Sequence, residues 1–375
     1  MTSAWARTVA GATLVDLAIG PLFAWDVLAG GLARDLHVAD AALAPVFSVG
    51  LAAFAVGVLV GGRVADVVAP RRLALLSAAL GGAGLLGSAF ATAPAQLVAA
   101  FGLGLGAASG LGYATAVRTA GTVAHQRGLA LALVVSAYAG GTVVLAPAAG
   151  ALVATAGPRL TLALMATATA GVVLAGAALL PGRPPASRHP ANVRRLQLGR
   201  PELALWAAFG LGSAPGLVAF AAAGEVLGDP HAAAPAVLVL SLGNLGGRLL
   251  AGPASDRVGR PIALHVNVAA LLAVCAALVL LGSGPARVAV LLVLGLQYGA
   301  LSVLVPAALG DAVPAARFGA GYGVVFSGWG IAGLTAPVGA AVLSLHAGWQ
   351  AVFVACGGAA LLAWSAVALL PGRRG

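Results

Sequence analysis

Long apolar segments recur along the whole chain, and this feature limits most strongly what the chain can fold into. A helix needs about 20 consecutive apolar residues to cross a bilayer. Only 8% of the residues are charged, against about 25% in a soluble domain, so too few polar side chains exist to cover a water-facing surface. We therefore expect an all-α integral membrane protein. The same composition excludes a soluble enzyme, a disordered chain and a nucleic-acid-binding domain.

Twelve segments of the chain are long and apolar enough to span a membrane, and they leave no room for a soluble catalytic domain. The predicted spans are residues 8–31, 41–61, 71–93, 95–117, 128–155, 159–180, 202–225, 233–253, 262–283, 286–309, 319–344 and 350–370. The first span is longer than the apolar core of a signal peptide and is interrupted by Asp16, so we expect it to be retained.

All 20 basic residues are arginines, and their distribution predicts the orientation of the spans. With the N-terminus inside the cell, 16 arginines fall in cytoplasmic segments, three fall in outer loops, and Arg248 lies within a span. Cytoplasmic loops of membrane proteins carry the excess of positive charge. We therefore expect a monomeric, multi-pass protein of the plasma membrane with both termini in the cytoplasm.

The chain contains two similar halves separated by a polar segment. Residues 181–200 are rich in proline and arginine, which predicts a cytoplasmic linker between residues 1–180 and 201–375. The halves match at an offset of about 190 residues, since GRVADVVAPRR begins at Gly62 and GPASDRVGRP begins at Gly252. Each half has six predicted spans, an even number, so the two repeats run parallel. Such repeats predict a central pathway that works by alternating access.

The loop after the second span of each half carries the pattern G-x-x-x-D-R-x-G-R, and on this pattern the chain resembles the major facilitator superfamily. The resemblance implies twelve transmembrane helices in two six-helix parallel repeats, with a gate at these loops. The implied gate residues are Gly62, Asp66 and Arg71 in the first copy and Gly252, Asp256, Arg257 and Arg260 in the second. The first copy is degenerate because Val67 replaces the usual basic residue.

The chemistry of the motif supports a gate. An aspartate at a helix end can accept hydrogen bonds from the N-terminus of a facing helix and from an arginine. We therefore expect Asp66 and Asp256 to latch one conformation until the repeats rock. The alternative is that the motif is a simple topological stop signal.

Three further segments resemble the oxalate/formate antiporter and monocarboxylate transporter branch of that superfamily. They are GPLFAWDVLAGGL (20–32), GLGLGAASGLGY (102–113) and NLGGRLLAGPASDRVGR (244–260). In the branch, an arginine of the third segment binds a substrate carboxylate. The resemblance thus implies a secondary active transporter of small organic anions, monocarboxylates in particular, and not an enzyme.

Arg248 is the residue that indicates an anionic substrate. Placing an arginine within a span costs about 2.5–3.5 kcal/mol, so such a residue normally faces a water-filled cavity. Ser241, Asn244 and Arg248 share one helical face and are expected to line the pathway. A guanidinium can hold a carboxylate with two parallel hydrogen bonds. The alternative is that Arg248 extends to the cytoplasmic interface.

Aromatic residues are expected to complete the substrate site. Trp329 stands where the oxalate carrier has a lysine, so a monoanion suits the site better than a dianion. Tyr113 and Tyr138 would add hydroxyl groups, although each of the three aromatic side chains, taken alone, is more often a packing residue than a site residue. Tyr298 is a weaker candidate.

Asp16 is the candidate for proton coupling. The branch carries an acid four residues before the arginine, where this chain has Asn244. Our hypothesis is that Asp16 pairs with Arg248 in the empty site, and that protonation of Asp16 frees the arginine for the anion. This mechanism would give anion–proton symport. The alternative is a local capping or packing role.

Two other functions remain open on the sequence. A drug or hydrophobic-metabolite exporter of the same superfamily is favoured by Pro147 near glycines in the fifth span, and a sensor or scaffold could keep the same fold. No cofactor or metal is expected, because the histidines are scattered and no phosphate-binding loop is present. The expected partners are a small organic anion, the lipid bilayer and protons, with no nucleic acid.

Overall fold

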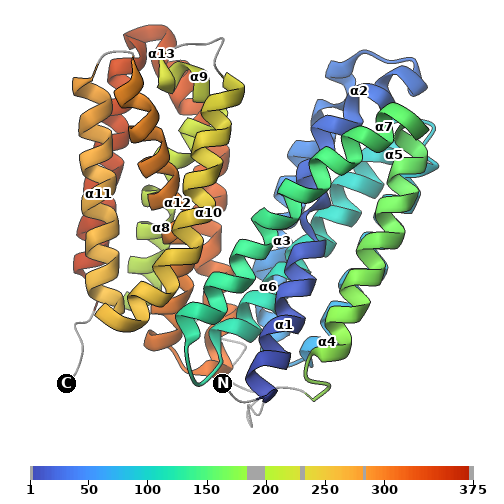
Figure 1. Ribbon diagram of the computed structural model, residues 1–375, viewed down its shortest axis with the longest axis horizontal. Coiled ribbons are helices and arrows are strands. Elements are labelled where there is room, and N and C mark those ends of the chain that lie inside the picture. Colours follow the sequence, from blue (N-terminus) through green and yellow to red (C-terminus); the bar gives the residue numbers. More distant parts are fainter. Residues whose placement is uncertain (1–2, 184–198, 229–232, 282–283, 371–375) are drawn as a thin grey trace. The chain divides into compact units, whose positions relative to one another are not determined.

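The computed structural model describes residues 3–183, 199–228, 233–281 and 284–370, and these residues form helices with no β-strand (Figure 1). The helices are α1 (Ser3–Ala18), α2 (Trp25–Leu36), α3 (Ala44–Ala65), α4 (Pro70–Ala89), α5 (Pro94–Leu97), α6 (Gly106–Gly121), α7 (Arg127–Leu179), α8 (Arg200–Ala221), α9 (Ala223–Leu227), α10 (Ala233–Val258), α11 (Arg260–Leu280), α12 (Pro285–Ala312) and α13 (Phe318–Ala368). A π-helical segment, η3 (Val98–Leu105), joins α5 to α6. The predicted all-α membrane architecture is confirmed.

Nine helices of the described ranges are long and apolar enough to cross a membrane, and a bent pair at the N-terminus makes ten. The bend of 43° interrupts the first predicted span, where the 3-10 helix η1 (Gly20–Ala24) separates α1 from α2. Glycine and proline open this segment, and proline lacks the N–H that a continuous helix needs. The first predicted span therefore corresponds to a bent pair of helices and not to one straight helix.

The long helices α7 and α13 each contain two predicted spans joined at a single glycine. Gly157 has φ 79° and ψ 164°, and Gly348 has φ 76° and ψ 170°. This backbone region is essentially restricted to glycine. When α7 and α13 are divided at these glycines, the helices correspond to the twelve predicted spans.

The chain forms two compact units, which we describe separately. Unit 1 contains Met1–Val123, Leu133–Arg195 and Ala315–Gly323, and unit 2 contains Ala124–Ala132, Leu196–Pro314 and Val324–Gly375. Each unit therefore holds most of one repeat and the beginning of one helix from the other repeat. Residues 184–198 of the predicted linker lie outside the described residues.

The internal repeat extends to individual hydrogen bonds. In unit 1, Arg159 Nη1 donates to the Ala89 carbonyl oxygen (3.1 Å), two residues after the glycine that divides α7. In unit 2, Gln350 Nε2 donates to the Val279 carbonyl oxygen (2.7 Å), two residues after the glycine that divides α13. These positions are related by the offset of about 190 residues seen in the sequence. Each unit thus secures the C-terminal end of its third span in the same way.

Candidate substrate site and gate

Arg248 and Asn244 form a polar pair on α10 in unit 2. Arg248 Nε donates to Asn244 Oδ1 (3.0 Å), one helical turn away, and both side chains are half-buried. Ser241 is also half-buried and lies one turn before Asn244. A Cβ added to Gly299 of α12 would overlap the Asn244 carbonyl oxygen, so glycine permits α12 to pack directly against this part of α10.

A tyrosine from α12 joins this cluster, and sequence reasoning ranked it too low. Trp329 Nε1 of α13 donates to the Tyr298 hydroxyl oxygen (2.9 Å), and Gly299, the next residue of α12, packs against Asn244. An indole N–H can only donate, so the Tyr298 oxygen accepts this bond and its own hydroxyl proton stays available for donation. The ring of Phe326 lies 5.0 Å from Trp329, and that of Phe220 lies 5.6 Å from Tyr298. Unit 2 therefore combines a guanidinium, a hydroxyl donor and aromatic surfaces.

The predicted site residues Tyr113 and Tyr138 lie in unit 1, where they form an aromatic cluster. Their rings meet edge to face at 5.5 Å, and Phe54 contacts both of them. The Tyr113 hydroxyl is 3.3 Å from the Tyr322 hydroxyl, and Tyr322 stacks on Phe318 with ring centroids 6.0 Å apart. Sequence reasoning missed Tyr322. The pattern that could have indicated it is the aromatic pair Phe318 and Tyr322, which are four residues apart at the start of α13.

Asp16 lies in α1 of unit 1, and its side chain is completely buried. A buried carboxylate in a membrane span is costly and normally functional. Arg248 belongs to unit 2. The pairing of Asp16 with Arg248 stays a prediction.

The first motif copy builds a buried hydrogen-bonded contact in unit 1. Asp66, directly after α3, accepts bonds from the backbone N–H groups of Gly319 (3.0 Å) and Ala320 (2.8 Å) in the first turn of α13. Arg118 Nε at the end of α6 also donates to Asp66 (3.2 Å), and its Nη2 donates to the Ala315 carbonyl oxygen (3.4 Å). Burial raises the pKa of Asp66, while the bonds from Ala320, Gly319 and Arg118 oppose that rise.

The second motif copy builds the equivalent contact in unit 2. Asp256 accepts bonds from the backbone N–H groups of Gly128 and Leu129 (both 3.1 Å) in the first turn of α7. Arg260 donates to Asp256, and Arg260 and Arg127 both pair with Asp311. We call these two contacts the Asp66 latch and the Asp256 latch.

The two latches differ in exposure. The Asp66 side chain is 1% exposed and that of Arg118 is 8% exposed, whereas Asp256 is 23% exposed and Asp311 is 50% exposed. The motif copy that is degenerate in sequence thus makes the more buried latch. Sequence reasoning missed Arg118, because its contact with Asp66 joins residues 52 positions apart.

Glycines allow both latches to close. A Cβ added to Gly62 would overlap the Gly319 carbonyl oxygen, and one added to Gly252 would overlap the Gly128 carbonyl oxygen. The remaining predicted gate residues, Arg71 and Arg257, are exposed, and no bond from either side chain to a latch aspartate occurs within the described ranges.

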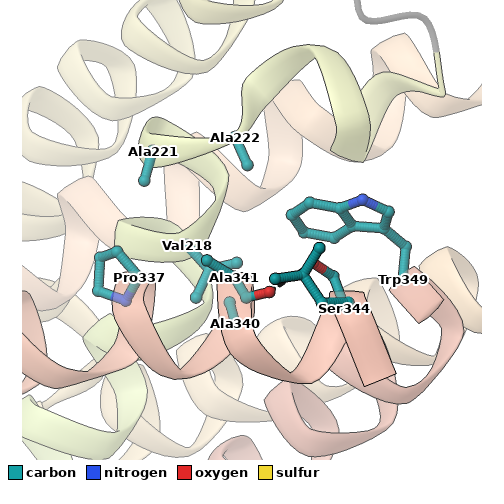
Figure 2. Close-up of a pocket in the computed structure, with 9 residues that line it drawn as sticks. Val218, Ala221, Ala222, Pro337, Ala340, Ala341, Ser344 and Trp349 are labelled. Carbon is teal, nitrogen blue, oxygen red and sulfur yellow. Dashed lines mark hydrogen bonds between the residues drawn. The ribbon is translucent and has the colours of Figure 1, made fainter. Parts of the chain in front are cut away.

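A separate apolar cavity of about 240 Å³ lies in unit 2, between the end of α8 and α13 (Figure 2). Trp349 and Pro337 flank it, and Ser344 is a polar side chain of its lining. None of the predicted substrate residues lines it, and the described lining contains no charged side chain.

The side chain of Pro147, which favoured an exporter in the sequence, lies outside the described residues. Within the described ranges no three His, Cys, Asp or Glu side chains are grouped to hold a metal ion.

The sequence pattern that defines the Major Facilitator Superfamily matches residues 8–304. The chain belongs to this superfamily. Its structure is similar to that of the human organic anion transporter MFSD10 (TETRAN), with a TM-score of 0.73, 16% identity, and coverage of 98% of this chain and 100% of that one. It is also similar to the proton:xylose symporter XylE bound to 6-bromo-6-deoxy-D-glucose, with a TM-score of 0.71, 16% identity, and coverage of 96% and 95%. A search of curated proteins found no match.

These comparisons confirm the predicted superfamily and fold. As a member of this superfamily, the protein is a multi-pass membrane protein and a transporter of the secondary type. An identity of 16% shows the shared fold alone. The resemblance to the oxalate/formate and monocarboxylate branch stays a prediction.

Proposed function

We propose that this transporter carries small organic anions, monocarboxylates in particular, across the plasma membrane. The observation that carries the proposal is the half-buried guanidinium of Arg248 within α10, held by Asn244, with the Tyr298 hydroxyl of the neighbouring helix α12 as a second donor. A carboxylate could accept two parallel bonds from the guanidinium and a third from the hydroxyl. The similar structures are titled an organic anion transporter and a sugar symporter, so the fold admits either cargo and the choice depends on Arg248.

The surroundings of Arg248 favour a monoanion with an apolar part. In the described part of this cluster Arg248 supplies one positive charge, and Trp329 takes the place that a lysine has in the resembling oxalate carrier. Phe326 and Phe220 extend the aromatic surface next to Trp329 and Tyr298. An apolar substituent on the carboxylate can pack against these rings.

We further propose that the two latches hold one end of the pathway closed during alternating access. Each aspartate binds the N-terminus of a helix from the other repeat, and those N–H groups have no partner within their own helix. Opening that end would break both sets of bonds. Substrate binding must then favour the opened state by enough free energy to offset the lost bonds.

Asp16 is the proposed proton-coupling residue. Its complete burial supports this role, because an ionisable side chain buried within a membrane span is costly and is normally functional. Asp16→Asn should abolish proton uptake that accompanies the anion. Proton uptake that is unchanged while transport stays intact would contradict the coupling role.

Uptake of labelled small carboxylates into proteoliposomes, with and without a pH gradient, tests the substrate class. Arg248→Ala should abolish uptake, and Arg248→Lys should impair it because lysine lacks the planar fork. Arg34→Ala is the matched control, since Arg34 is exposed at the end of α2. Uptake that survives Arg248→Ala at the wild-type rate would refute the proposal.

The cavity of Figure 2 favours one second candidate, an exporter of hydrophobic compounds, because its described lining is apolar apart from Ser344. The same proteoliposomes distinguish the two candidates. Movement of neutral dyes without movement of carboxylates would establish the exporter.

A further inference from the structure

Among the arginines of unit 1 that lie outside the latches and the substrate cluster, four stand on neighbouring chain segments. Arg71 and Arg72 stand in the first turn of α4, Arg7 lies in α1, and Arg183 follows the end of α7. All four side chains are exposed. We call them the arginine cluster.

Backbone contacts bring the three chain segments of the arginine cluster together. Arg7 Nε donates to the Leu179 carbonyl oxygen (3.3 Å), and the Arg71 N–H donates to the Pro181 carbonyl oxygen (3.3 Å). The Arg71 side chain passes Gly182, with its Cδ 4.0 Å from the position that a Cβ would take. The start of α1, the start of α4 and the end of α7 therefore meet at one end of unit 1.

The charge of this cluster is not compensated by acidic side chains. Within the described part of the chain, none of the four guanidinium groups forms an ion pair. The nearest aspartate along the chain, Asp66, is held by Arg118 and by α13. In the second motif copy Arg260 binds Asp256, which lies four residues before it. In the first copy the residue four positions after Asp66 is Pro70, and Arg71 lies five positions after Asp66.

An apolar stripe continues the arginine cluster along α4. Leu75 and Leu76 follow Arg71 and Arg72 by one helical turn and are 40% and 47% exposed, and Leu80 follows after another turn with 44% exposed. Residues four apart lie on the same helix face. Since α4 is long and apolar enough to cross a membrane, we expect these exposed leucines to face hydrocarbon and the arginines at the start of α4 to lie at the headgroup level.

We propose that the arginine cluster binds an anionic phospholipid. The phosphate of its headgroup lies between Arg71, Arg72 and Arg183, and an acyl chain lies along Leu75 and Leu76. A guanidinium makes bidentate hydrogen bonds to phosphate, which gives a cluster of arginines both charge and geometric selectivity. The apolar stripe favours a lipid over an acidic protein segment, because that part of the surface lies within the bilayer.

Native mass spectrometry of the full-length transporter with equal amounts of dioleoyl-phosphatidylglycerol and dioleoyl-phosphatidylcholine tests this proposal. The wild type should retain phosphatidylglycerol preferentially. Arg71→Gln/Arg72→Gln should lower the preference by about 25-fold, because each of the two basic side chains contributes about five-fold at an anionic surface. Arg71→Lys/Arg72→Lys should keep most of it. The matched control is Arg257→Gln/Arg317→Gln, which removes the same charge from exposed positions outside the cluster.

Three outcomes would overturn the proposal. They are an equal retention of both lipids by the wild type, a glutamine pair that keeps the preference, and a control pair that loses as much of it. Displacement of the lipid by millimolar glycerol phosphate would also overturn the proposal, because it would show that the cluster binds a phosphate group without any contribution from the acyl chain. Arg183→Gln, in the segment after α7, should lower the preference as well and serves where the double variant fails to fold.

Discussion

Removing the Asp66 carboxylate should open the latched end of the transporter far more than removing the Asp256 carboxylate. Asp66→Ala leaves Arg118 buried and unpaired, together with two helix N–H groups. Breaking a buried ion pair by removing one partner costs about 3–5 kcal/mol. Asp256 is partly solvated, and exposed ion pairs contribute about 0.2–1 kcal/mol. We therefore expect the latched state to lose about 3 kcal/mol in Asp66→Ala and about 1 kcal/mol in Asp256→Ala.

Thiol labelling can measure this difference, because Cys275 and Cys356 are both buried. Thr119 is 5% exposed and follows Arg118 directly in the chain, so a Thr119→Cys variant provides the reporter thiol. Its labelling rate should rise about 150-fold with Asp66→Ala and about five-fold with Asp256→Ala, following the two free energies. Asp35→Ala, which removes an exposed pair with Arg159, should leave the rate unchanged. An equal or larger rise with Asp256→Ala would refute the reasoning.

The remaining predictions use the same reporter or thermal unfolding. Because the pKa of Asp66 is raised where it is buried, a proton binds the latched state more tightly than the open one. We compare labelling at each pH with that of the same cysteine in the unfolded chain, because the thiolate fraction itself rises with pH. This relative labelling should slow as the pH falls and speed up as the pH rises through the pKa of Asp66, and the relative dependence should vanish in Asp66→Ala. Gly62→Ala should raise labelling, because its Cβ would overlap the Gly319 carbonyl oxygen; Gly140→Ala, with open space around it, should not. Gly157→Ala should lower the melting temperature by forcing a strained backbone that costs about 1–3 kcal/mol, whereas Gly171→Ala should not lower it.

The sequence predicted the fold well because apolar segment length is a local property. It could not predict that the first span breaks at Gly20–Ala24, nor that a single glycine joins the two spans within α7 and within α13. Boundaries of this kind depend on backbone torsions at a few residues.

The gate was predicted in part. Asp66 and Asp256 could be chosen because each occupies the aspartate position of the repeated G-x-x-x-D-R-x-G-R pattern, and their contacts with helix N-termini agree with the expected chemistry. Arg118 could not be found, because α6 reaches Asp66 only through tertiary packing. Tyr298 was ranked too low for the same reason, since its position depends on the bond from Trp329 in α13 and on the packing of α12 against α10.

Each compact unit depends on a helix start that the opposite half of the chain supplies, and this reciprocity has a consequence for split transporters. Ala315–Gly323 completes unit 1, and Ala124–Ala132 completes unit 2. A fragment ending at residue 183 or one beginning at residue 199 would each lack such a piece. Produced separately, the fragments should be degraded. Produced together, the two fragments should complete each other's units and restore transport. Cutting the chain at the linker should therefore lower the transport rate only slightly.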